Sequence, residues 1–297
     1  MVSKQNYNKK NSQKERSCIN FYRNRMVEDM GLHSLSKITQ NRYINGVRKL
    51  CRFYKCSPEK ISKDDVRIYL IFLIGESGLA PNTIRVIYYG IKFFYKITLG
   101  QDWKLFEAIR LPKSKYLPIV LSFEEIKIIL SHIYNPTYRM ALILIYACGL
   151  RLSECLHLRI EDIDSSRMVV KVKGKGNKMR YVPLPQHVLH LLRKYWQLNR
   201  PRPWLFKSQK TEKPISPRGI QIAFQGARKK ANINKIATIH TLRHSYATHL
   251  LENGVNIRII QGALGHQSSR STVIYTHLTA KTDLILNDAL NQIMSKL

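Results

Sequence analysis

The sequence predicts a mainly α-helical protein with a small β-hairpin, an α+β fold divided between two domains. Apolar residues recur with a helical period of about 3.6 residues through most of residues 20–111 and again in several segments after residue 119. One Gly-rich basic turn, GKGNKM, lies between the β-type runs RMVVKV and RYVPLP, which is typical of a hairpin. A stretch bracketed by Pro112 and Pro118 separates the two helical regions and predicts a linker at 112–118.

The region before the linker predicts a polar, basic, flexible arm over residues 1–17 and a helical domain over residues 18–111. Four helices are expected, and the first stops near Gly31. The second has apolar or aromatic residues in a helical rhythm at Ile38, Tyr43, Val47, Leu50 and Phe53. Ser62, three residues before Asp65, is a candidate cap of the third helix, and Pro81 opens the fourth.

The charge of the chain points to a polyanionic partner. The 50 Lys and Arg residues exceed the 19 Asp and Glu residues, which gives a formal net charge of +31. Residues 1–118 carry 23 basic and 9 acidic residues and residues 119–297 carry 27 and 10, so both domains are basic. Nucleic acid is the leading candidate partner. The side chains expected to contact DNA are Arg42, Arg48, Lys49, Arg85, Lys92, Lys96, Lys178 and Arg218.

The second domain, residues 119–297, opens with a capping box at Ser122 and Glu125. After Asn135-Pro136, the run YRMALILIYACGL is almost entirely apolar and predicts a buried helix capped at Gly149. Arg151 follows immediately. An arginine there is costly unless it has a partner or a function, and Glu154 is the candidate partner.

The later elements are a hairpin with Lys175 at its tip, a helix over residues 187–200, a short strand at 204–206 and a helix that starts at Ser216-Pro217. That last helix is basic on its outer face and is a candidate for lying in a DNA groove. The final helix, DLILNDALNQIMSKL, is amphipathic and is expected to pack either on its own domain or on a neighbouring copy.

Residues 240–277 concentrate groups that can bind a phosphate or move a proton. His240 and Arg243 are three residues apart on a predicted helix and share a face, whereas His244 is expected to point elsewhere. A zinc site at His240 and His244 is disfavoured, because the intervening Thr-Leu-Arg supplies a cation instead of a glutamate. His266 follows a second helix, and Tyr275 comes nine residues later.

These residue types suit DNA strand cleavage without a metal or other cofactor. Arginine provides permanently charged, bidentate donors for phosphate oxygens, and such electrostatic stabilisation is often the largest catalytic contribution. Lysine or histidine can transfer protons, and tyrosine can attack phosphorus and retain the strand as an ester. That ester preserves the bond energy, so the strand can be rejoined without ATP.

Four segments resemble the tyrosine recombinase (phage integrase) family, which includes Xer recombinases and mobile-element integrases: ACGLRLSECLHL, VKGKGNKMRYVPLP, HTLRHSYATHLLENG and IIQGALGHQSSRSTVIYTH. The resemblance extends to the helical segment 20–111, which is similar to the family's SAM-like core-binding domain. It implies a two-domain, C-shaped clamp around DNA that cuts and rejoins strands through a 3′-phosphotyrosine.

The resemblance also implies a role for each matching residue. The expected roles are two phosphate-binding arginines (Arg151, Arg243), a general acid (Lys175), a proton acceptor (His240), a phosphate hydrogen-bond donor (His266), the nucleophile (Tyr275) and a support for Arg151 (Glu154). The implied partners are double-stranded DNA and further copies in a homotetramer on two DNA sites, with a related recombinase as an alternative subunit.

Three functional alternatives stay open on the sequence. A non-catalytic DNA-binding regulator is disfavoured by the complete set of residues, and a type IB topoisomerase-like enzyme would nick and reseal without exchanging strands. The sequence does not separate an Xer-type resolver from a mobile-element integrase.

Five cysteines without a CxxC pair, and the lack of a long apolar run, predict a cytoplasmic protein with reduced thiols and no membrane partner.

Overall fold

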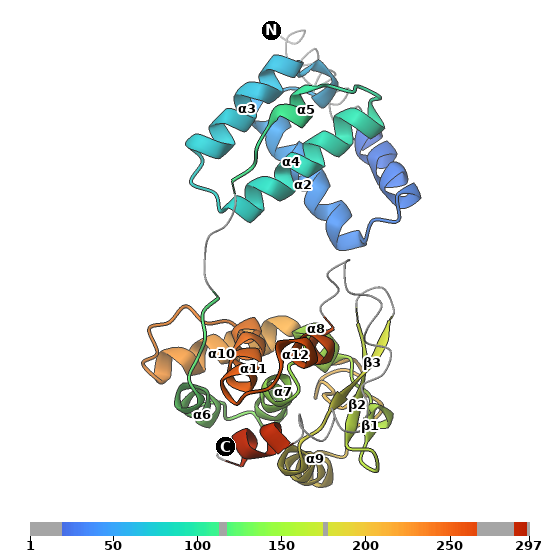
Figure 1. The fold of residues 1–297 in the computed structure, drawn as a ribbon. Coiled ribbons are helices and arrows are strands. Elements are labelled where there is room, and N and C mark those ends of the chain that lie inside the picture. The colour runs from blue at the N-terminus through green and yellow to red at the C-terminus, as the bar shows by residue number, and fades with distance from the viewer. Residues whose placement is uncertain (1–19, 113–117, 175–177, 266–287, 296–297) are drawn as a thin grey trace, which may run out of the picture. The chain divides into compact units, whose positions relative to one another are not determined.

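The computed structural model describes residues 20–112, 118–174, 178–265 and 288–295. The chain divides into two compact units, one up to residue 116 and the other from residue 117. Figure 1 shows the helices of the first unit, and the helices and small sheet of the second. Within the described ranges, no helix is long and apolar enough to cross a membrane.

The first unit is a helical bundle. Its elements are a helix over residues 20–32, α2 (Lys37–Tyr54), a 3₁₀ turn (Pro58–Lys60), α3 (Lys63–Gly75), α4 (Pro81–Phe93), a π-helical turn (Phe94–Thr98) and α5 (Leu105–Ala108). The cap predicted at Ser62 is a complete capping box, in which Ser62 Oγ accepts from the Asp65 N–H and the Asp65 carboxylate accepts from the Ser62 N–H.

The centre of the first unit is the crossing of α2 and α4 (Figure 1). A Cβ at Gly90 would lie 2.8 Å from the backbone of Tyr43, and one at Gly46 would lie 3.1 Å from the carbonyl oxygen of Ile87. The two helices therefore approach this closely only because a glycine stands on each of them. The helical rhythm predicted along α2 holds at Val47 and Leu50, which are buried, whereas Ile38 and Phe53 are exposed.

The second unit is mostly helical and contains a three-stranded antiparallel sheet. Its elements are α6 (Phe123–Ser131), α7 (Pro136–Ala147), α8 (Leu152–Leu156), a 3₁₀ turn (Ile160–Asp162), β1 (Ile163–Asp164), β2 (Val169–Lys173), β3 (Met179–Pro183), α9 (Gln186–Asn199), α10 (Pro217–Lys230), α11 (Ile239–Glu252), α12 (Ile257–Leu264) and a terminal helix over residues 288–294. The mainly helical fold with a small sheet is therefore confirmed.

The core of the second unit surrounds α7, which packs against both α9 and α11 (Figure 1). Most of α7 is buried, as its apolar run predicts. The sheet has the order β1-β2-β3, and β3 packs beside α12. The predicted hairpin is formed by β2 and β3, whereas β1 was not predicted. The strand predicted at 204–206 is wrong, because only an isolated bridge joins Trp204 to Arg159.

The terminal helix packs on its own chain. Leu290 and Met294 are each 1% exposed and belong to the same core as α7. The side-chain oxygen of Asn291 accepts a hydrogen bond of 3.0 Å from the backbone N–H of Gln186, the first residue of α9. Of the two placements left open by the sequence, the described part of this helix adopts the one within its own domain.

Candidate active site

Arg151 and Glu154 form the ion pair that their spacing predicts. Gly149, with a φ of +58°, turns the chain out of α7, and Arg151 then stands at the N-cap position of α8. The Glu154 carboxylate accepts from the Arg151 backbone N–H at 2.8 Å and from Arg151 Nη1 at 2.7 Å. The Arg151 side chain is still 34% exposed, so this guanidinium has donors that can reach a ligand.

Arg243 is placed on α11 and its side chain is 2% exposed. Its Nη1 donates to the carbonyl oxygen of Gly149 at 2.5 Å and its Nη2 to that of Leu264 at 2.6 Å. Nη1 also lies 3.8 Å from Glu154 Oε2. Burial, and then the neighbouring charge of Arg151, lower the pKa of Arg243 to about 10, which leaves it charged at neutral pH.

Arg180, on β3, is a third arginine of this group and was not predicted. Its Nη1 and Nη2 each donate at 2.9 Å to a different oxygen of Glu154, which is a bidentate pair. Burial raises the pKa of Glu154, but the hydrogen bonds from Arg180 and from the Arg151 backbone outweigh it and bring that pKa to about 2. We call Arg151, Arg180 and Arg243 around Glu154 the arginine cluster.

The strand pattern contains a signal that would have identified Arg180. Val172 pairs with Arg180, and Val170 pairs with Val182, in the β2-β3 register. All three valines are fully buried, so Arg180 stands on the face of the hairpin that turns toward the core. A charged residue at such a position requires a buried partner, and Glu154 is that partner.

His240 and His244 lie together near the start of α11. Their ring centroids are 4.6 Å apart with the rings nearly perpendicular, so the expectation that His244 points elsewhere is wrong. Residues four apart on a helix share a face, which explains the contact. Burial, followed by the charges of His244, Arg243 and Arg151, lowers the pKa of His240. His240 is therefore neutral at neutral pH and able to accept a proton.

Two other side chains of α11 have structural contacts. His249 Nδ1 lies 2.7 Å from the Tyr146 hydroxyl oxygen and links α11 to α7. Tyr246 is 2% exposed and its ring packs against Gly149, where a Cβ would lie 2.6 Å from ring atoms. Burial strongly raises the pKa of Tyr246, which makes it a poor nucleophile.

Three of the predicted site residues, Lys175, His266 and Tyr275, lie outside the described residues. The structure brings together the remaining ones, Arg151, Glu154, His240 and Arg243, around a single group of charges. Arg243 donates to the carbonyl oxygens of Gly149 and Leu264, so the turn after α7 and the helices α8, α11 and α12 all contribute to one site.

The side chains expected to contact DNA differ in how available they are. Arg42, Arg48, Lys49, Lys178 and Arg218 are exposed. Lys96 Nζ is paired with Asp102 at 2.9 Å, and Arg85 Nη2 donates to the carbonyl oxygen of Pro112 at 3.3 Å. These two donors are therefore partly engaged within the protein.

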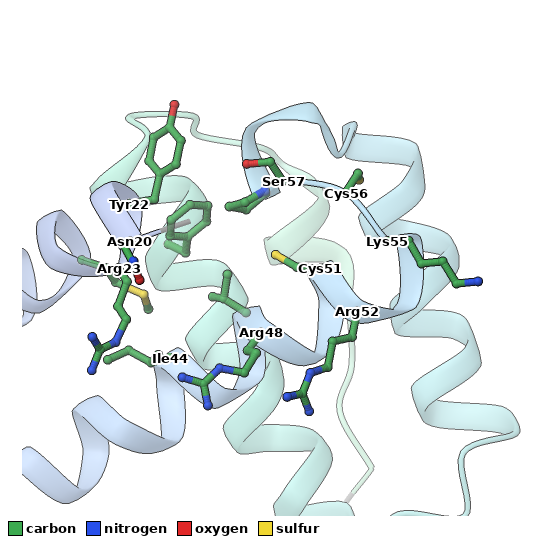
Figure 2. Close-up of a pocket in the computed structure, with 14 residues that line it drawn as sticks. Asn20, Tyr22, Arg23, Ile44, Arg48, Cys51, Arg52, Lys55, Cys56 and Ser57 are labelled. Carbon is green, nitrogen blue, oxygen red and sulfur yellow. The ribbon is translucent and has the colours of Figure 1, made fainter. Parts of the chain in front are cut away.

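A pocket of about 590 Å³ opens beside the basic side of α2 (Figure 2). Figure 2 shows the guanidinium groups of Arg23, Arg48 and Arg52 along one side of it, with Cys51 among the residues lining the interior. Arg23 and Arg52 were not among the side chains expected to contact DNA. Their position next to Arg48 extends the basic surface of the first unit.

Comparisons with known proteins place the chain in a family. Residues 120–282 match the phage integrase family, and residues 22–105 match the phage integrase N-terminal SAM-like domain. The chain is 39% identical over 258 residues to a putative integrase/recombinase, y4qK, of Sinorhizobium fredii, covering 86% of this chain and 84% of the relative. It is 32% identical over 237 residues to the tyrosine recombinase XerA of Pyrococcus horikoshii, covering 78% and 81%.

The fold is shared with a lambda integrase dimer bound to a core site, with a TM-score of 0.69 over 89% of this chain and 99% of that one, at 20% identity. The family match spans more than half of the chain, and the chain therefore belongs to the phage integrase family of tyrosine recombinases. It is a site-specific DNA recombinase, an enzyme class that cuts and rejoins DNA through a 3′-phosphotyrosine.

Proposed function

We propose that the arginine cluster is the phosphate-binding half of the active site and that Tyr275 is the nucleophile. The observation that carries this proposal is that two arginines beside the same carboxylate, that of Glu154, differ strongly in how exposed they are. Arg243 is buried and held by two carbonyl oxygens, whereas Arg151 touches the same Glu154 and is 34% exposed. A rigid cation beside an accessible one suits a phosphodiester, whose negative charge increases as phosphorus is attacked.

In the proposed reaction, the Tyr275 hydroxyl oxygen attacks phosphorus and the bond to the 5′-oxygen breaks. His240 accepts the tyrosine proton. The lowered pKa of its imidazole agrees with this role, because it keeps the ring neutral, and so able to accept a proton, at neutral pH. Lys175 gives a proton to the departing 5′-oxygen, and His266 donates a hydrogen bond to a non-bridging phosphate oxygen. A free 5′-hydroxyl from a second strand reverses these steps and restores a phosphodiester, so neither ATP nor a metal ion enters the balance.

We further propose that the partners are double-stranded DNA and three other copies of this chain, assembled on two DNA sites. A lambda integrase tetramer bound to a Holliday junction shares the fold, with a TM-score of 0.70 at 19% identity. The basic segment at residues 1–17 and the net charge of +31 favour the mobile-element context over chromosome-dimer resolution, whereas the relatives carry both kinds of name, integrase/recombinase and Xer recombinase. A cytoplasmic location is part of this proposal.

Covalent capture tests the nucleophile. The full chain first selects a binding site from random-sequence duplexes, and that site is then synthesised with a nick that lets the cleaved end diffuse away. We expect the wild-type chain to form a covalent DNA adduct, and Tyr275→Phe to form none while still binding the duplex. Tyr246→Phe is the matched control and should form the adduct. An adduct that persists in Tyr275→Phe would contradict the assignment.

Strand exchange separates a recombinase from an enzyme that only nicks and reseals. Two labelled duplexes carrying the selected site are mixed with the chain, and joint products are resolved by size. We expect recombinant products that contain one arm from each duplex. Adduct formation with no exchanged product under any site spacing would favour the topoisomerase-like activity.

A further inference from the structure

Arg180 takes part in no step of the proposed reaction, yet its contacts connect most of the site. We propose that Arg180 is a positioning residue, the fixed counter-ion of Glu154 that keeps Arg151 available for the scissile phosphate and holds Arg243 in its place beside it. The inference rests on the proposed function for the identity of the bound anion, and its test includes a measurement that needs no strand cleavage.

The geometry makes Arg180, and not Arg151, the principal partner of Glu154. Arg180 engages both carboxylate oxygens at 2.9 Å, and its Nε donates to the carbonyl oxygen of Ala263 at 3.1 Å. Its side chain is 15% exposed. The Arg151 side chain makes one bond to the carboxylate, from Nη1, and remains 34% exposed. One arginine is therefore committed to the protein and the other is only partly engaged.

Removing Arg180 would change what Glu154 attracts. The carboxylate is 4% exposed, so water cannot replace the lost partner. Among the residues that the structure describes, the cations that remain beside Glu154 are Arg151, already bonded to it, and Arg243, whose Nη1 is 3.8 Å away. Both would be drawn toward Glu154 and away from a phosphate, because the carboxylate and the phosphate compete for the same donors.

Arg180 also packs against two glycines that adjoin predicted site residues in the sequence. A Cβ at Gly265 would lie 3.1 Å from Arg180 Cδ, and one at Gly174 would lie 3.4 Å from Arg180 Nη1. Gly265 immediately precedes His266, and Gly174 immediately precedes Lys175. The Arg180 side chain thus contacts Glu154 of α8 and lies against the hairpin and the end of α12.

The first experiment measures the rate of adduct formation at saturating protein, together with the Kd for the selected duplex. We expect Arg180→Met to slow cleavage by about 100-fold with little change in Kd, as a misplaced catalytic group does. Arg167→Met is the matched control. Arg167 is an exposed arginine beside the same sheet, over the ring of Tyr181, and its loss removes the same charge. Its rate should stay within about threefold of wild type.

The diagnostic variant is the double substitution Arg180→Met with Glu154→Gln. If Arg180 acts by neutralising Glu154, removing the carboxylate charge should make the double variant cleave about tenfold faster than Arg180→Met. A residue needed only for packing would show no such recovery. A rate for Arg180→Met within about threefold of wild type, or a double variant no faster than Arg180→Met, would overturn the inference. If Arg180→Met does not fold, Arg180→Gln decides, since it keeps a polar side chain but removes the charge. A rate for Arg180→Gln within about threefold of wild type would then overturn the inference.

The second experiment uses inorganic sulfate as the anion and thermal unfolding as the readout. The part of the sulfate-induced rise in Tm that Arg151→Met removes reports anion binding at the arginine cluster. Arg180→Met should remove the same part of the rise in Tm, and Arg167→Met should leave the rise unchanged. If Arg167→Met removes that part and Arg180→Met does not, the result counts against Arg180. A wild-type chain that forms no adduct but shows this pattern would disprove the proposed nucleophile while supporting the role of Arg180.

Discussion

At the scale of single residues, the site contains chemically identical groups in very different surroundings. Arg151 and Arg243 have the same guanidinium, yet one is 34% exposed and the other 2%. The buried one satisfies two carbonyl oxygens and is part of the folded core, whereas the exposed one mainly offers donors to a ligand. Substitution of the buried Arg243 is therefore expected to cost more stability than substitution of the exposed Arg151.

Alanine substitutions of the two arginines should differ in their effect on folding. Arg243→Ala leaves two buried carbonyl oxygens without donors and a cavity, and should lower the free energy of unfolding by about 3 kcal/mol. Arg151→Ala should cost no more than about 1 kcal/mol, because Arg180 still neutralises Glu154. Both should abolish adduct formation. Urea unfolding measures the difference, and equal losses of stability would contradict this reading of the burial.

The contact between His240 and His244 predicts a shift in the pH dependence of cleavage. Burial and then His244 lower the pKa of His240 below 6.5. The cleavage rate should therefore fall only when the pH drops below 6.5 and His240 becomes protonated. His244→Gln removes the second cause and should move this acid limb to higher pH. A pH-rate profile of adduct formation measures it, with the exposed His190→Gln as control. An unmoved limb would show that His244 does not influence His240.

His240, His244 and His249 should make the stability of the folded chain depend on pH. The pKa values of His240, His244 and His249 are all lowered in the folded chain, chiefly by burial. The unfolded chain therefore binds protons more readily, and stability is lost as the pH falls through the ordinary histidine pKa of 6.5 toward the folded values.

At the scale of elements, the helix crossing of the first unit depends on two glycines. An alanine at Gly90 would place its Cβ 2.8 Å from the Tyr43 backbone, which cannot move without separating α2 from α4. Gly90→Ala should therefore lower the unfolding free energy by about 1–3 kcal/mol. Gly75→Ala, in α3 with nothing within 4 Å, should be neutral or stabilising. Thermal unfolding compares them, and an unaffected Gly90→Ala would contradict the tight crossing.

Element prediction from the sequence succeeded where local chemistry decides structure. Ser62 with Asp65 and Ser122 with Glu125 form the capping boxes expected, and Gly149 adopts the left-handed conformation expected after α7. It failed where tertiary contacts decide. The run 204–206 has a β-type sequence but only one bridge partner, and β1 has two residues, too few for a detectable pattern.

At the scale of the whole molecule, the charge is distributed over both units, and DNA binding should depend on salt. Affinity should fall by about 1,000-fold or more between 50 and 200 mM salt if several phosphates are contacted by each unit. Replacing Arg42 and Arg48 with Gln should reduce the slope of log Kobs against log salt by about 2. Lys194→Gln, an exposed cation on α9, should leave the slope unchanged. A flat response of the wild-type chain would contradict electrostatic binding of DNA.

The sequence by itself determined the helical fold class, the family and the set of residues to examine, because caps, helical periods and motif spacings are local properties of the chain. The tertiary structure alone decided how the charges are shared. Arg180 lies 26 residues from Glu154 and 83 from Ala263 along the chain, and no local pattern joins them. Their pairing follows from the register of β2 with β3 and the packing of β3 on α12, which bury one carboxylate among three arginines.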